Sequence, residues 1–143
     1  MKGKVLIIED NEVWQNILKE PLESDGFFVE VVNNLDEAVK KVNREKFHFI
    51  TIDMQLHNDT TTPEQYEGWN ILEIIKKLRI QIITPCMVIT AFGANYLKHK
   101  GAKKVESLFF MDKSKFDEQA FLDKVNEQVQ RINLRFKDDH RGD

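Results

Sequence analysis

The stretch FHFITID at residues 47–53 decides the fold that the sequence predicts. Its apolar, β-branched and aromatic residues are typical of a strand that is buried on both faces. The stretch ends at Asp53, where a carboxylate stands in place of another apolar side chain. A second apolar run, KVLII at residues 4–8, is followed in the same way by Glu9 and Asp10. Two buried strands that end in acids indicate a site at the edge of a sheet.

Strands and helices are predicted to alternate along the rest of the chain. The further strands are expected at residues 27–32, 86–90 and 106–111, and the helices at 11–26, 34–46, 69–78, about 93–101 and 116–136. This order predicts a parallel sheet with helices on both faces, and right-handed crossovers make it a doubly wound α/β fold.

The sequence predicts the ends and the apolar faces of the first and last helices. Asn11 is predicted to cap the first helix and Asp25-Gly26 to end it. Its apolar face is predicted to contain Val13, Trp14, Ile17, Leu18 and Leu22. The last helix carries an apolar stripe from Phe121 to Phe136, and the polar residues 137–143 are expected to fray as a tail or to begin a linker. Residues 1–136 are therefore expected to form one domain.

Composition and charge argue against several classes of function. The 143 residues include 21 basic and 24 acidic side chains, and a net charge of -3 argues against direct binding of nucleic acid or of an anionic membrane. We find no apolar segment long enough for a signal peptide or a membrane span. The single cysteine, Cys86, is expected to be a buried thiol in a reducing cytoplasm.

The acids at the strand ends are expected to meet. A parallel sheet brings Glu9, Asp10 and Asp53 to one edge, where their charges repel each other. A hard divalent cation relieves that repulsion, and an all-oxygen site fits Mg²⁺, or Mn²⁺, better than Zn²⁺.

Two further strand ends add groups that complement the acids. Thr90 ends the predicted strand 86–90, and Lys113 follows the predicted strand 106–111. Carboxylate, cation, hydroxyl and ammonium together suit the binding and transfer of a phosphoryl group, with Asp53 as the nucleophile.

Four motifs at successive strand ends give the chain a family resemblance. They are IIED (7–10), ITIDMQL (50–56), VITA (88–91) and FFMDK (109–113). In this order they resemble the receiver domain of two-component response regulators. The resemblance implies a five-stranded, flavodoxin-like (βα)₅ sheet with strand order 2-1-3-4-5.

The resemblance also implies a role for each matching residue. Asp53 is the phosphorylated aspartate, Glu9 and Asp10 hold Mg²⁺, and the backbone carbonyl of Gln55 completes the metal site. Thr90 bonds to the phosphoryl group, Lys113 is the conserved lysine of the family, and Phe110 is the aromatic switch residue. We further expect Phe92 to shield the acyl phosphate from water. The implied partners are a histidine kinase or phosphotransfer protein and a downstream protein or fused effector.

The chain departs from the family at two loops. Residues 57–68 are about seven residues longer than expected, either as a solvated insertion or as a lid or partner contact, and they include His57. Ser114 follows Lys113 where the family has a proline in a cis peptide. The sequence leaves open whether this peptide is trans or strained.

Three other functions remain possible at this point. The chain could be an unphosphorylated receiver-like module that only binds proteins. It could also be a hydrolase with an aspartyl-phosphate intermediate, although Gln55 stands where such enzymes place a second acid. A flavin binder of the same topology is disfavoured because acids occupy the loop after the first strand. We therefore expect a phosphoacceptor rather than an enzyme.

Overall fold

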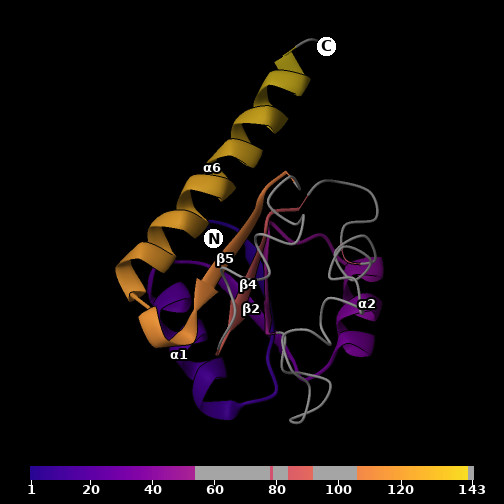
Figure 1. The fold of residues 1–143 in the computed structure, drawn as a ribbon. Helices are drawn as coiled ribbons and strands as arrows, with labels where there is room; N and C mark the ends of the chain where they lie inside the picture. Colours follow the sequence, from indigo (N-terminus) through magenta and orange to yellow (C-terminus); the bar gives the residue numbers. More distant parts are fainter. Residues whose placement is uncertain (54–77, 79–83, 92–105, 142–143) are drawn as a thin grey trace.

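Five parallel strands form one sheet in the order β2-β1-β3-β4-β5 (Figure 1). The computed structural model describes residues 1–53, 78, 84–91 and 106–141. The strands are β1 (Lys4–Ile8), β2 (Phe28–Val32), β3 (Phe49–Asp53), β4 (Cys86–Thr90) and β5 (Leu108–Asp112). The predicted α/β fold and strand order are confirmed.

The register places the strand ends at one edge of the sheet. Ile8 pairs with Ile52 between β1 and β3, so Glu9 and Asp53 each come next on adjacent strands. Asp53 pairs with Ile89 of β4, one residue before Thr90. Because all pairs are parallel, the ends of β1, β3 and β4 lie side by side, as the sequence predicts.

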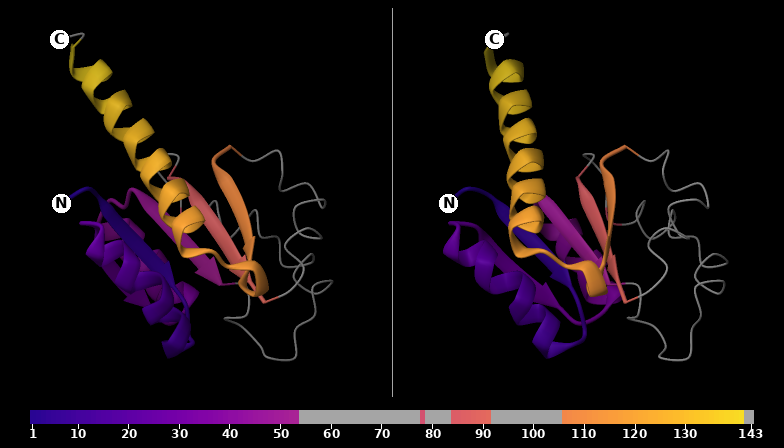
Figure 2. Two further views of the ribbon diagram at one scale, coloured as in Figure 1. Left: turned by 90° about the vertical axis from the view of Figure 1, so that its left-hand side faces the viewer. Right: turned by 60° about the vertical axis from the view of Figure 1, so that its left-hand side comes forward.

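Helices cover both faces of the sheet. The helices α1 (Glu12–Ser24) and α6 (Glu118–Arg141) lie on one face, and α2 (Leu35–Arg44) lies on the other (Figures 1 and 2). Leu18, Leu22, Phe121 and Val125 pack against the first face. Ala38 is buried against the second face, where Leu35, Val39 and Val42 pack beside it. Cys86 is completely buried, as expected.

The ends of α1 follow from the sequence. The Asn11 side chain accepts a hydrogen bond from the backbone N–H of Trp14, which caps the helix. Gly26 follows the helix at a φ of 96°, a conformation that glycine adopts without steric cost. The expectation that Val13 belongs to the buried face is wrong. Its side chain is 66% exposed, because the helix turns it away from the sheet.

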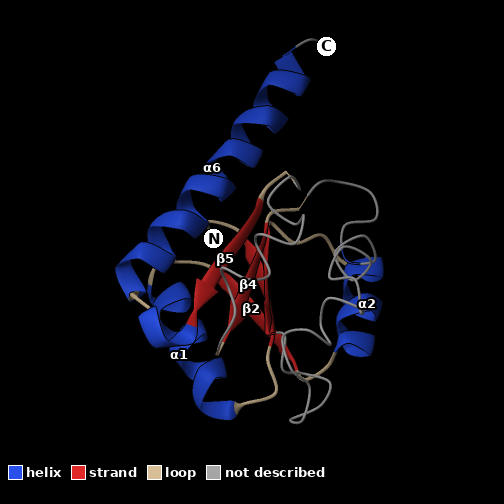
Figure 3. Cartoon of the chain, viewed as in Figure 1, coloured by secondary structure: helices blue, strands red, loops and turns tan. Residues whose placement is uncertain are grey.

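The last helix is longer than predicted. α6 continues to Arg141, so the residues expected to fray from 137 onward are helical up to that point. Figure 3 shows that its C-terminal half extends past the sheet. None of the described helices is long and apolar enough to cross a membrane.

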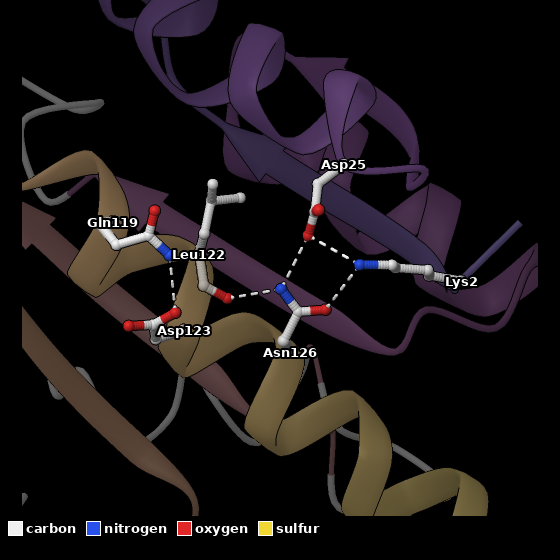
Figure 4. A network of polar contacts seen from close by, with 6 residues as sticks. All are labelled: Lys2, Asp25, Gln119, Leu122, Asp123 and Asn126. Atoms are coloured by element: carbon white, nitrogen blue, oxygen red, sulfur yellow. Dashed lines mark hydrogen bonds and ion pairs between the residues drawn. The ribbon is translucent and has the colours of Figure 1, made fainter.

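A polar network joins α6 to the end of α1 (Figure 4). Asn126 donates a hydrogen bond of 2.8 Å to the Asp25 carboxylate, and Lys2 reaches the same carboxylate at 2.9 Å. These contacts hold the pKa of Asp25 below its usual value, the bond from Asn126 first and that from Lys2 second. The network therefore ties the two helices on this face together at one end.

We expect His48 to make the stability of the fold depend on pH in mild acid. Its Nδ1 accepts a hydrogen bond of 3.0 Å from the backbone N–H of Lys4, and its partial burial lowers its pKa below 6.5. Since the unfolded chain takes up this proton more readily, the stability contribution is complete above about pH 6.5 and is lost as the pH falls below it. We expect the urea midpoint of the wild type to fall more between pH 7.5 and 5.5 than that of His48→Asn, in which the side-chain amide oxygen replaces Nδ1. Parallel pH profiles of the two proteins would contradict this.

Candidate functional site

Three carboxylates meet at the C-terminal edge of the sheet. Glu9 follows β1, Asp10 comes next in the loop to α1, and Asp53 ends β3. One oxygen from each lies within 4.8 Å of the others. Glu9 and Asp53 are 1% and 4% exposed, whereas Asp10 faces solvent. The structure thus brings together the three acids that the sequence predicted would meet.

Lys113 bonds to two of these acids. Its ammonium group donates a hydrogen bond of 2.8 Å to Glu9 Oε1 and another of 2.8 Å to Asp53 Oδ2. Lys113 begins a 3₁₀ turn, Lys113–Lys115, directly after β5. The peptide between Lys113 and Ser114 is trans, which settles the alternative left open by the sequence. The lysine therefore reaches the acids without a cis bond.

The pKa shifts of Glu9 and Lys113 reflect the burial and close spacing of the acidic groups. Burial, with a further contribution from the neighbouring Asp53 carboxyl, raises the pKa of Glu9 to about 8 against the opposing effect of Lys113. Burial also disfavours the charged form of Lys113, but its bonds to Asp53 and Glu9 outweigh this and raise its pKa. One lysine therefore does not offset the cost of ionising all three carboxyl groups, and Glu9 holds its proton more tightly than a free carboxyl group does.

The donor set fits a hard divalent cation. Glu9 Oε2 is buried and has no hydrogen-bond partner among the described residues. A buried carboxylate oxygen without a partner is costly, and either a proton shared with Asp53 or a cation relieves that cost. Three carboxylates with one side open to solvent are the kind of oxygen site that Mg²⁺ or Mn²⁺ occupies.

Two other predicted residues lie on strands next to the acids. Thr90 is the last residue of β4, is 1% exposed, and lies one position beyond the residue paired with Asp53. Phe110 lies opposite Val88 and packs, partly buried, against the core on the α2 face. Phe110 therefore contributes to the core in this structure, and its role as a switch residue stays a prediction.

Several predicted features lie outside the described residues. They are Gln55, His57, Phe92, the loop 57–68, the helix at 93–101 and, except for the buried helical residue Leu78, the helix at 69–78.

The sequence analysis missed a contact made by Trp14. This residue was expected to lie in the core, and it does pack at the edge of the core beneath α1. Its ring also lies over the Lys113 ammonium, with 4.9 Å between Nζ and the ring centroid. No pattern in the sequence indicates this contact, because it depends on the path of the turn that follows β5.

The sequence is similar to that of known proteins from one family. The family described as "Response regulator receiver domain" matches residues 5–126. The chain is 30% identical over 102 residues to the alkaline phosphatase synthesis transcriptional regulatory protein PhoP of Bacillus subtilis, covering 71% of this chain and 38% of that protein. It also spans 22% and 41% of two other curated relatives. The chain thus spans less than half the length of these relatives.

Solved structures share the fold. A response regulator from Burkholderia pseudomallei, solved with a phosphorylated aspartic acid, is 25% identical with a TM-score of 0.65, over 92% of this chain and 71% of that one. The receiver domain of the sensor histidine kinase PA1611 from Pseudomonas aeruginosa, solved with a magnesium ion in its active-site cleft, is 19% identical with a TM-score of 0.65. That match covers 90% of this chain and 98% of that one.

Proposed function

The chain belongs to the response regulator receiver domain family, and we propose that it accepts a phosphoryl group on Asp53 with Mg²⁺ bound. The observation that carries this proposal is the buried Asp53 carboxylate, which lies within 4.8 Å of two other carboxylates and 2.8 Å from the Lys113 ammonium. Members of this family are generally phosphoacceptors in two-component signal transduction rather than catalytic enzymes.

Each residue has a part in the proposed transfer. A carboxylate oxygen of Asp53 attacks the phosphorus, forming a P–O bond as the bond to the donor breaks, and the donor keeps the electron pair. Lys113 and the Thr90 hydroxyl stabilise the charge on the phosphoryl oxygens. Glu9, Asp10, Asp53 and the backbone carbonyl of Gln55 are the proposed ligands of Mg²⁺. When bound, the ion neutralises charge on the acids and on the phosphoryl group.

The phosphoryl donor that we propose is a phosphohistidine on a histidine kinase or a phosphotransfer protein. Family membership implies a kinase partner. PhoP and the two other curated relatives are longer than this chain, so a fused effector or a separate downstream protein could receive the signal. Adding charge at Asp53 would shift the population of two conformations, with Thr90 and Phe110 as the proposed switch residues and Phe92 as the proposed shield.

The test is the intact mass of the protein after incubation with acetyl phosphate. We expect one added phosphoryl group in the presence of Mg²⁺, none with a chelator in its place, and loss of the group on treatment with hydroxylamine, which cleaves acyl phosphates. A protein without an adduct under all conditions would favour the module that only binds proteins. Repeated turnover of a phosphomonoester would favour the hydrolase.

A further inference from the structure

Trp14 covers the ammonium group on which the site depends. The Lys113 Nζ lies 2.8 Å from both Glu9 Oε1 and Asp53 Oδ2, and 4.9 Å from the centroid of the Trp14 ring. The ammonium is therefore bonded to the two carboxylates while it is also in contact with an indole ring. A cation within about 6 Å of a tryptophan ring is attracted by the negative charge of its face.

The same ring also contacts the turn that carries the lysine. Phe116 follows the turn Lys113–Lys115, and its backbone N–H bonds to the Lys113 carbonyl at 3.3 Å. The Phe116 ring meets Trp14 edge-on at 5.5 Å between centroids, and it lies 5.6 Å from the ring of Phe121. Phe121 is completely buried in the core beneath α1 and α6.

These contacts form an aromatic row, Trp14–Phe116–Phe121, from the site into the core. The peptide after Lys113 is trans, and Ser114 stands where the family has a proline. The backbone of this turn is therefore less restricted than it would be with a proline at that position. The aromatic row supplies the anchor, since one end is fixed in the core and the other contacts the lysine. The four-carbon side chain of a lysine is otherwise flexible.

We propose that Trp14 is a positioning residue that holds Lys113 against Glu9 and Asp53 and thereby sets the rate at which Asp53 accepts a phosphoryl group. This inference rests on the proposed function. Charge stabilisation is effective only when the donor group is in place before the reaction, so a lysine that samples other positions slows the transfer. Trp14 acts through Lys113 and needs no contact with the phosphoryl group.

The experiment compares two substitutions of Trp14. Trp14→Phe keeps a ring face, whereas Trp14→Leu keeps an apolar side chain without one. With acetyl phosphate and saturating Mg²⁺, we expect Trp14→Leu to be phosphorylated about three- to tenfold more slowly than the wild type. Trp14→Phe should be phosphorylated at a rate close to that of the wild type. Ile17→Ala, a truncation of a half-buried side chain on the same helix, controls for loss of packing and should leave the rate within about twofold.

A second readout does not depend on phosphorylation. In proton NMR spectra, the ε-methylene resonances of Lys113 should be shifted upfield by the Trp14 ring current, and this shift should disappear in Trp14→Leu. In the phosphorylation experiment, equal rates for the wild type and Trp14→Leu would overturn the inference and leave the proposed function standing. Equal rates for Trp14→Leu and Trp14→Phe, both slow, would replace positioning with a general packing role. A wild type that gains no phosphoryl group would overturn both proposals, and the ring-current shift would then describe a purely structural contact.

Discussion

We expect the substitution Asp53→Asn to abolish the phosphoryl adduct that acetyl phosphate forms with the wild type. The amide oxygen that remains is a poor nucleophile, and the acceptor that we propose is Asp53 at the end of β3 rather than Glu9 or Asp10. Intact mass spectrometry of the wild type and of Asp53→Asn measures this directly. The effect is all-or-none, which makes it the largest that we expect.

We expect the same substitution to weaken the binding of a divalent cation. Asn removes one negative charge of three, and at about 4 Å a charge pair near a protein surface is worth roughly 4 kcal/mol before solvation offsets part of it. We expect Mg²⁺ affinity, measured by calorimetry, to fall at least about tenfold.

A matched control is Asp36→Asn, which also replaces a carboxylate with an amide. Asp36 is exposed in the first turn of α2, the helix on the face opposite α1 and α6, and it is not one of the three clustered acids. This control should keep both the adduct and the Mg²⁺ affinity. Adduct formation by Asp53→Asn at the wild-type rate would show that another residue is the acceptor.

Phe49→Ala should cause the largest loss of stability. Phe49 is completely buried in the central strand β3, within the core beneath α1 and α6. Truncating a buried phenylalanine costs about 3–5 kcal/mol, because it removes apolar contacts and leaves a cavity. In a domain of this size we expect the thermal midpoint to fall by roughly 10 °C or more.

Phe28→Ala is the comparison for this loss. Phe28 lies on the edge strand β2 and is 50% exposed, and its ring contacts the Lys4 ammonium at 5.3 Å. We expect it to cost less than about 1 kcal/mol in urea unfolding. Similar losses from both substitutions would contradict the placement of Phe49 in the core.

The sequence predicted the sheet and most of the site because both follow from strand ends. An apolar run that stops at an acid specifies where a buried strand leaves the core, and parallel pairing then places Glu9, Asp10 and Asp53 at one edge. The cap of α1 was equally readable, since an asparagine before an amphipathic run satisfies the first free N–H groups.

Other features depended on tertiary contacts that periodicity does not encode. Val13 belongs to the apolar pattern of α1, yet the orientation of the helix on the sheet leaves it exposed. Trp14 reads as a core residue, and only the path of the turn after β5 brings Lys113 under its ring. The length of α6 was underestimated because the polarity of residues 137–143 was taken as a sign of fraying, whereas the helix continues to Arg141.

The central claim is that the ends of separate parallel strands create one cation site from Glu9, Asp10 and Asp53. The most direct measurement is anomalous diffraction from a crystal soaked in Mn²⁺, which scatters anomalously and takes the same oxygen ligands as Mg²⁺. We predict one strong peak about 2.2 Å from an oxygen of each of the three carboxylates, or bridged to one of them by water. Asp53 turned away from Glu9 and Asp10, with no peak between them at saturating Mn²⁺, would contradict the claim.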